Sequence, residues 1–197
     1  MSFSFKKLSL YIRKKRDALL RFLLGKNNTD PDIITLLSLL ISIPTAYFFL
    51  INNIVLSGIF LFVVVVLDIL DGFAARSNKN SSEIGLTIDY SIDRMSEAVI
   101  KIGIIFSGLT NAVLALLSLF GNTLVTFFVT EGERHNIKMN YITPFPTRFL
   151  ILAVIILSPF FDINKMINIA FLTELVITSV MSFYALHKVL IARETMQ

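Results

Sequence analysis

The sequence contains no cysteine among its 197 residues, and it has few glycines, prolines and charged residues. The absence of cysteine excludes disulfides, thiolate metal sites and a thiol nucleophile. Eight glycines and five prolines exclude collagen-like and low-complexity chains. The two histidines, His135 and His187, are far apart in the sequence and cannot form a zinc site by themselves. Charged residues make up 16% of the chain, whereas an ordinary soluble domain has about 25%.

Hydrophobic residues dominate what is present. They make up 55% of the chain, above the value of about 45–50% that is usual for soluble domains. Six runs are long and apolar enough to cross about 30 Å of hydrocarbon as helices, which takes roughly 20 residues each. These runs cover residues 33–51, 54–72, 84–107, 111–130, 147–162 and 165–190. Because the connections are short, we expect an all-α, antiparallel bundle of six transmembrane helices in one domain, residues 27–197.

The first 26 residues differ from the rest because basic residues interrupt their apolar residues. A cleavable signal peptide would instead have a continuous apolar centre. The pattern over residues 1–26 predicts an amphipathic juxtamembrane helix that lies in the plane of the lipid headgroups. A solvated basic tail or a nucleic-acid-binding arm is the alternative, which the leucines and phenylalanines of this segment disfavour.

Basic residues are distributed unevenly across the predicted topology. Eight of the 18 lysines and arginines precede the first run, and those that follow the second, fourth and sixth runs bring the total on that side to 15. Lys165 lies on the opposite side. Because Lys and Arg accumulate on the cytoplasmic side of membrane proteins, we expect a multi-pass protein of the cytoplasmic membrane with both termini in the cytoplasm.

Four aspartates are concentrated where the second and third runs meet. Asp68 and Asp71 are three residues apart, and Asp89 and Asp93 are four apart, so each pair lies on one face of its helix. The connecting loop is short, so we expect the four carboxylates to converge near the cytoplasmic edge of the bilayer. Like charges in that place require cations. Oxygen ligands of this kind suit a hard divalent ion, Mg²⁺ first, with Mn²⁺ or Ca²⁺ as alternatives.

Three small residues beside the aspartates leave room for a ligand. Gly72 and Gly85 have no side chain and Ala75 has only a methyl group, so a bound molecule can lie close to both helices. A nucleotide suits this position because metal ions bridge the phosphate oxygens of diphosphates. The alternative is that the acids only pair with nearby cations and tie the helices together. Those cations are Arg76, Arg94 and Lys101.

The same residues form a pattern of eight fixed positions, D-x-x-D-G-x-x-A-R, then eight residues, then G-x-x-x-D-x-x-x-D. Its members are Asp68, Asp71, Gly72, Ala75, Arg76, Gly85, Asp89 and Asp93. This pattern resembles, without departure, the signature of the CDP-alcohol phosphotransferase (CDP-alcohol phosphatidyltransferase) family. Residues 31–35 resemble the segment that opens the first span of that family, and the layout of six runs behind a basic N-terminal segment is similar too.

The resemblance implies a homodimeric, six-helix enzyme of phospholipid biosynthesis whose active site opens to the cytoplasm. Members of the family move a phosphoryl-linked lipid from a CDP-activated donor to an alcohol and release CMP. The resemblance therefore implies a CDP-lipid or CDP-alcohol donor, a small polar alcohol acceptor, membrane lipids and a second copy of the chain as partners, and no nucleic acid. It also implies two divalent ions as cofactors, Mg²⁺ or alternatively Mn²⁺.

The resemblance also assigns roles to individual residues. Asp68, Asp71 and Asp89 would be the principal metal ligands. Asp93 would complete the metal site and act as the general base toward the acceptor hydroxyl, a role that its place one turn beyond Asp89 also suits. The residues that would bind the CDP group are Gly72, Ala75, Arg76 and Gly85.

Residues 93–97 and three basic residues bear on the identity of the acceptor alcohol. The run Asp-Arg-Met-Ser-Glu at 93–97 resembles the inositol-phosphate-using branch of the family, which includes archaeal archaetidylinositol phosphate synthases. A phosphorylated acceptor needs a cationic pocket, which Arg134, Lys138 and Arg148 would form. Acids stand within residues 127–134, where that branch has basic residues. Glycerol phosphate, serine, another polyol and a soluble CDP-alcohol donor therefore stay open.

Further charged residues lie inside the predicted spans. Glu97 and Lys101 are one helical turn apart, and we expect them to pair with each other or with Arg94. Glu174 lies in the sixth run with no cation nearby in the sequence. We expect it to face the bundle cavity or the dimer seam, or to be protonated.

A divalent-cation transporter is the alternative from a different class, because acids inside a membrane also mark ion paths. A transporter requires carboxylates near the midplane and a polar route to both faces. Here the acids lie toward one side, and the loops near residues 52–53 and 107–111 carry no charge. A purely structural membrane protein is the third class, and the array of four aspartates disfavours it. The sequence therefore favours the enzyme.

Overall fold

The computed structural model describes residues 31–77, 83–135, 137, 139 and 145–195, and their side chains within 33–71, 90–132, 134–135, 137, 139 and 145–191. The described residues form helices and no strands. The helices are α2 (Pro31–Leu50), α3 (Ile54–Ser77), α4 (Glu83–Phe106), α5 (Ala112–Arg134), α6 (Thr147–Leu157) and α7 (Ile163–Thr195). The helix predicted over residues 1–26 lies outside the described residues, and the division into segments 1–26 and 27–197 stays a prediction.

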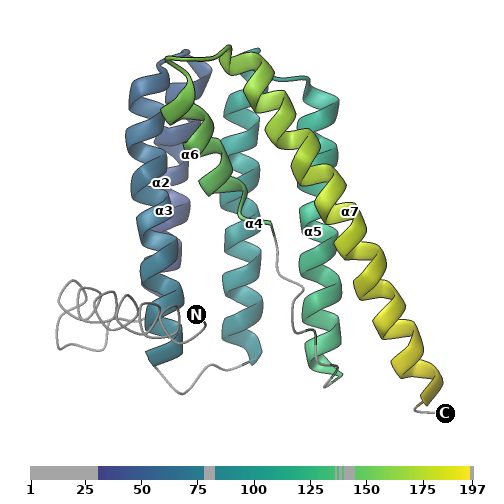
Figure 1. The fold of residues 1–197 in the computed structure, drawn as a ribbon. Helices are drawn as coiled ribbons and strands as arrows, with labels where there is room; N and C mark the ends of the chain where they lie inside the picture. The colour runs from purple at the N-terminus through teal and green to yellow at the C-terminus, as the bar shows by residue number, and fades with distance from the viewer. Residues whose placement is uncertain (1–30, 78–82, 136, 138, 140–144, 196–197) are drawn as a thin grey trace, which may run out of the picture.

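The helices run up and down in an antiparallel bundle (Figure 1). α2 packs against α3 and α4, and α5 packs against α7. The short helix α6 contacts α3 and α7, and so connects the two groups. α3 ends and α4 begins at the same end of the bundle, where α5 and α7 also end (Figure 1). α6 begins about halfway along the bundle and runs toward the opposite end.

Four of the helices are long and apolar enough to span a membrane. Their apolar segments are Ile33–Leu50, Ile54–Asp71, Ala112–Gly132 and Ile163–Ile191. Their outward faces are apolar, and side chains such as Val55, Val113 and Phe183 are 64–74% exposed, as a surface that contacts lipid requires. The prediction of an all-helical, multi-pass membrane protein is confirmed.

The predicted count of six transmembrane helices is not established by the part of the chain that the structure describes. α4 carries six charged residues in its 24 positions. α6 has 11 residues, which at about 1.5 Å per residue is roughly half of the 30 Å that a span needs. The predicted fifth run, 147–162, is shorter as a helix because Pro159 has no N–H with which to continue it.

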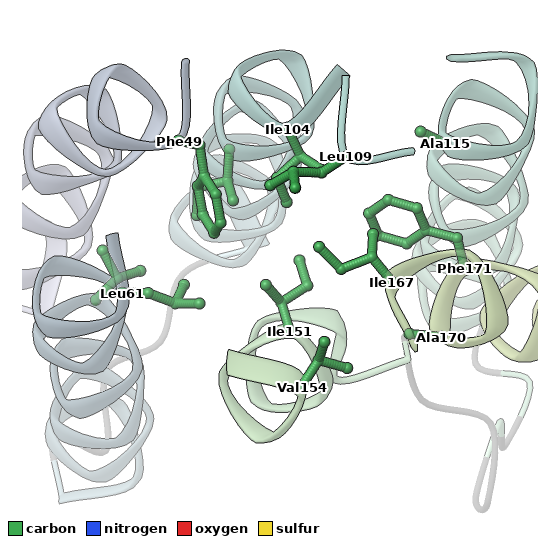
Figure 2. Packing of buried hydrophobic residues seen from close by; sticks show 12 residues of the cluster. Phe49, Leu61, Ile104, Leu109, Ala115, Ile151, Val154, Ile167, Ala170 and Phe171 are labelled. Carbon is green, nitrogen blue, oxygen red and sulfur yellow. The ribbon is translucent and has the colours of Figure 1, made fainter. Parts of the chain in front are cut away.

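The main hydrophobic core occupies the half of the bundle away from the α3–α4 connection. Side chains from all six helices or from their ends meet there, with Ile151 and Val154 of α6 among them (Figure 2). α2 and α4 approach each other closely at Gly103, where a Cβ would collide with the backbone of Ala46. This packing holds the helices that carry the polar residues of the other half in fixed positions.

Candidate functional site

Three of the four predicted metal ligands converge in the structure. Asp68 and Asp71 come from the last turns of α3, and Asp93 comes from α4. Each offers a carboxylate oxygen, and these three oxygens lie within 4.8 Å of one another. The three side chains are half-buried. The three-residue spacing of Asp68 and Asp71 and the antiparallel return of α4 therefore place three of the four carboxylates together, and the place of the Asp89 side chain stays a prediction.

The remaining predicted site residues lie partly outside what the structure describes. The side chains of Gly72, Ala75, Arg76, Gly85 and Asp89 are not described, although all five positions are helical. Lys138 also lies outside the described residues. The roles assigned to these six residues stay predictions.

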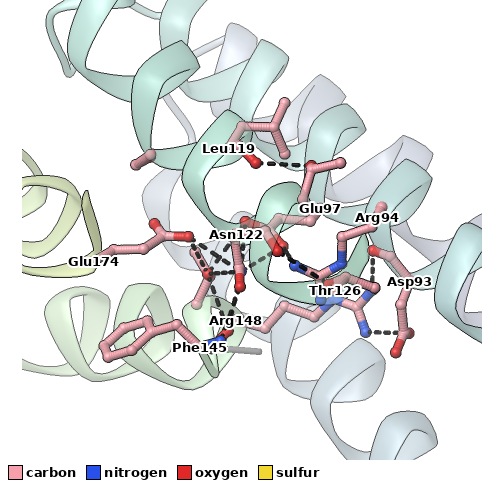
Figure 3. Close-up of polar contacts among 12 residues, drawn as sticks. Asp93, Arg94, Glu97, Leu119, Asn122, Thr126, Phe145, Arg148 and Glu174 are labelled. Atoms are coloured by element: carbon pink, nitrogen blue, oxygen red, sulfur yellow. Dashed lines mark hydrogen bonds and ion pairs between the residues drawn. The ribbon is translucent and has the colours of Figure 1, made fainter. Parts of the chain in front are cut away.

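Arg148 of α6 contacts the cluster of aspartates. It lies in the first turn of α6 and is 7% exposed. Its Nη1 pairs with Asp68 and lies 3.2 Å from Oδ1 of Asp93. Its Nη2 donates a hydrogen bond of 2.8 Å to the backbone carbonyl of Asp93. Figure 3 shows this pairing between α6 and α4. The predicted acceptor-binding arginine thus contacts two of the predicted metal ligands.

The cluster suits a divalent cation in both charge and ligand type. Three carboxylates and one guanidinium leave two formal negative charges. Oδ1 of Asp68 is buried and has no hydrogen-bond partner among the described side chains, a costly state that a metal ion would relieve. Thr35 of α2 donates to Oδ2 of Asp71 at 3.3 Å. Carboxylate oxygens are the ligands that hard divalent ions prefer, so these aspartates can hold a metal ion.

A cavity of about 240 Å³ adjoins the aspartates. Asp68, Asp93 and Arg148 line it, together with residues of α4 and residues 145–149. A cavity of about 410 Å³ lies between α4 and α5, and Arg134 lines it. Both cavities are bordered by Tyr90 and Arg94.

The structure does not bring the two described acceptor candidates together in one pocket. Arg148 borders the cavity beside the aspartates, whereas Arg134 borders the second cavity. Arg134 is exposed and lies 3.5 Å from Glu131. Of the two, only Arg148 is a buried cation at the acidic cluster.

A second polar cluster lies directly beside the first, and Glu97, Lys101 and Glu174 within it are buried. Lys101 Nζ lies 2.8 Å from Glu97 and 2.9 Å from Glu174 of α7. Arg94 Nη1 pairs with the other oxygen of Glu97 at 2.5 Å. The predicted pairing of Glu97 with Lys101 is confirmed, and Glu174 faces the bundle interior. Two acids and two bases make this cluster neutral, in contrast to the aspartates.

Asn122 of α5 and Thr147 of α6 complete the buried cluster, and sequence reasoning missed both. Asn122 is 0% exposed and its amide contacts Glu97 and Glu174 (Figure 3). The hydroxyl of Thr147 lies 2.6 Å from Glu174. The available signal was an asparagine in the middle of an uncharged, predominantly apolar run, because a membrane-buried amide needs hydrogen-bond partners.

Comparison with known proteins identifies the relatives of this chain. Residues 28–190 match the family model described as CDP-alcohol phosphatidyltransferase. The archaetidylinositol phosphate synthase of Pyrococcus horikoshii is 37% identical over 103 residues, which are 52% of this chain and 55% of that protein. The archaetidylinositol phosphate synthase of Methanothermobacter thermautotrophicus is 27% identical over 107 residues, 54% of this chain and 55% of that protein. The chain therefore matches about half the length of these relatives.

Solved structures share the fold. The Mycobacterium tuberculosis phosphatidylinositol phosphate synthase (PgsA1) with CDP-DAG bound superposes with a TM-score of 0.67 at 19% identity, covering 88% of this chain and 92% of that chain. The structure of the same enzyme in complex with manganese and citrate also superposes with a TM-score of 0.67 at 19% identity, covering 87% of each chain. At this identity the likeness shows the fold.

Proposed function

Because the chain belongs to the CDP-alcohol phosphatidyltransferase family, we propose that it transfers a phosphoryl-linked lipid from a CDP-activated donor to an alcohol and releases CMP. The observation that carries this proposal is the convergence of Asp68, Asp71 and Asp93 beside a cavity. Three carboxylates beside Arg148 form an acidic site that suits a divalent cation, and the cavity next to them can admit a substrate.

The metal ligands in this proposal are Asp68, Asp71 and Asp93, with Asp89 as the fourth. Two Mg²⁺ ions, or Mn²⁺ ions, would neutralise the charge that develops on the diphosphate during transfer. Gly72, Ala75, Arg76 and Gly85 are the proposed CDP-binding residues. The unpartnered oxygen of Asp68 supports the assignment.

Asp93 is the proposed general base. Its side chain is 34% exposed and borders the cavity, so an acceptor hydroxyl can reach it. The contacts of Arg148 with the carboxylate and the backbone carbonyl of Asp93 fix the orientation of this side chain. In this orientation a carboxylate oxygen takes the hydroxyl proton as the acceptor oxygen attacks phosphorus.

The proposed acceptor is a phosphorylated polyol, with inositol phosphate first. Arg148 supports this choice because a buried guanidinium beside a cavity is suited to bind a phosphate by paired hydrogen bonds. The names of the archaeal relatives and of the structural neighbour point in the same direction. Arg134 and Lys138 are the further acceptor-binding candidates. Glycerol phosphate and serine are the alternatives.

The proposed setting is the cytoplasmic membrane, with both termini and the active site on the cytoplasmic side. The excess of basic residues on that side supports this orientation. The proposed assembly is a homodimer. Crosslinking of the protein in membranes tests the assembly, and a protease added from one side tests the orientation.

The proposal is tested by measuring CMP release from purified protein in lipid nanodiscs. The reaction contains a CDP-lipid, Mg²⁺ and one candidate acceptor at a time, and chelator replaces the metal in a parallel reaction. We expect CMP with inositol phosphate, none with chelator, and none with Asp71→Asn, which removes a proposed metal ligand. Absence of CMP with every acceptor, from protein that is folded and binds Mn²⁺, would contradict the proposed activity.

A further inference from the structure

Asn122 makes a two-point contact with the backbone of Phe145, just before α6 begins. The N–H of Phe145 donates to Oδ1 of Asn122 at 2.8 Å, and Nδ2 of Asn122 donates to the carbonyl of Phe145 at 3.1 Å. One side-chain amide thus satisfies both polar groups of a residue that lies outside any helix. Figure 3 shows Asn122 between Phe145 and the buried carboxylates.

The neighbours of Asn122 allow only one orientation of its amide. Nδ2 lies 3.1 Å from Glu97 and 3.3 Å from Glu174. Ionised carboxylates only accept hydrogen bonds, so the NH₂ group must face them. The opposite side of the amide is then an acceptor, and it faces the N–H of Phe145. The buried ion pairs therefore define how Asn122 holds the chain.

The start of α6 has little local support. Pro146 is the N-cap residue, and it makes no side-chain capping hydrogen bond. A helix without a capping side chain leaves N–H groups of its first turn without that support. The contacts that hold this end come instead from neighbouring helices: Asn122 of α5 bonds Phe145, Glu174 of α7 accepts from Thr147, and α4 contributes Glu97 to Thr147 and Asp93 to Arg148. Arg148 is the next residue along the chain.

We propose that Asn122 is a positioning residue for the phosphotransfer site. It fixes residues 145–147 against α5, and thereby places the guanidinium of Arg148 against Asp68 and Asp93. This inference rests on the proposed function and extends it to a residue that makes no hydrogen bond to the described metal ligands and does not line the cavity beside them. The neutral charge of the buried cluster agrees with a holding role, because that cluster has no excess charge with which to bind an ion.

The test compares Asn122→Ala with Asn168→Ala. Asn168 of α7 makes a similar contact near the opposite end of the bundle, where its Oδ1 accepts from the backbone N–H of Asn111 at 3.1 Å and from Thr110 at 3.0 Å. Both variants remove an amide that holds a connecting segment. Only Asn122 lies beside the site. A general loss of packing would therefore alter the kinetics of both variants, whereas a loss of positioning would alter the kinetics of Asn122→Ala alone.

The first readout is hydrogen–deuterium exchange of the peptide that contains residues 145–150. Loss of the Asn122 acceptor is expected to speed exchange there about tenfold in Asn122→Ala, with no change in Asn168→Ala. This measurement does not depend on the activity, so it reports on the contact even if no acceptor supports CMP release. Unchanged exchange in Asn122→Ala would show that the contact does not hold the segment.

The second readout separates positioning from a structural role. In Asn122→Ala we expect the KM for the acceptor to rise about tenfold, while the KM for the CDP-lipid and the affinity for Mn²⁺ stay within about twofold of the unsubstituted protein. A purely structural role would instead lower kcat and the number of Mn²⁺ sites together, with KM unchanged. That pattern, or kinetics unchanged despite faster exchange, would overturn the proposal. If Asn122→Ala does not fold, Asn122→Ser, which keeps a polar group but cannot bridge both backbone atoms, is measured in the same way.

Discussion

Lys101 provides a direct measure of how strongly the buried ion pairs stabilise the bundle. Its side chain is 1% exposed, and its Nζ lies 2.8 Å from Glu97, 2.9 Å from Glu174 and 2.9 Å from the hydroxyl of Ser118. Lys101→Met keeps the length of the side chain but leaves two carboxylates with Arg94 as their only described cation. Removing one partner of a buried ion pair costs about 3–5 kcal/mol. We expect a loss of this size in the free energy of unfolding, out of roughly 5–15 kcal/mol for a folded domain.

A second substitution tests the electrostatic origin of that loss. Glu174→Gln removes one negative charge with almost no change of shape and leaves Glu97 paired with Arg94. In the background of Lys101→Met, we expect it to restore more than about 1 kcal/mol, because no buried carboxylate then lacks a cation. In the unsubstituted protein the same change is expected to destabilise, because Lys101 loses one of its acceptors.

The assay is unfolding by sodium dodecyl sulfate in mixed micelles, followed by far-ultraviolet circular dichroism. Ser42→Ala is the control, because the buried hydroxyl of Ser42 bonds only within its own helix, to the carbonyl of Leu39 at 2.6 Å. It is expected to stay within about 0.5 kcal/mol of the unsubstituted protein. The reasoning fails if Lys101→Met lowers the free energy of unfolding no more than the control does. It also fails if Glu174→Gln, added to Lys101→Met, lowers the free energy of unfolding further.

Three further changes test the site and the packing. Asp93→Asn is expected to abolish CMP release while CDP-lipid binding, measured by calorimetry, is retained; turnover by this variant would refute its role as the base. Arg148→Gln is expected to raise the KM for a phosphorylated acceptor by roughly tenfold or more, whereas an equal effect with an unphosphorylated alcohol in steady-state kinetics would contradict phosphate recognition. Gly103→Ala is expected to lower the melting temperature, because its Cβ meets the backbone of Ala46; an unchanged melting curve would show that α2 and α4 separate freely.

The part of the site that the sequence predicts consists of short-range relations. Asp68 and Asp71 share a helix face because they are three residues apart. The chain returns antiparallel after α3, and α4 packs against α2 as α3 does, which brings Asp93 to the other two aspartates. Glu97 and Lys101 pair because they are four residues apart. The relations within α3 and within α4 follow from helix geometry alone, whereas the approach of Asp93 to Asp68 also depends on the packing of both helices against α2.

The sequence does not predict the contacts between side chains of helices that are distant along the chain. Glu174 has no cation nearby along the chain, yet it pairs with Lys101, 73 residues away. The place of Arg148 depends on where α6 begins within the bundle, which hydropathy does not specify. Hydropathy also predicts the fifth run as a full span, although the helix has 11 residues, because the apolar phenylalanines that follow Pro159 extend the run without extending the helix.

The contrast between the two polar clusters has a consequence for the metal-free protein. The neutral cluster around Lys101 is compensated by its own residues, and it lies next to the main hydrophobic core. The three aspartates are like charges with carboxylate oxygens within 4.8 Å of one another, and the described contacts place Arg148 against two of them, Asp68 and Asp93. Chelation should therefore loosen one end of α3 and α4 while the rest of the bundle keeps its shape, so that metal depletion produces local fraying and not global melting.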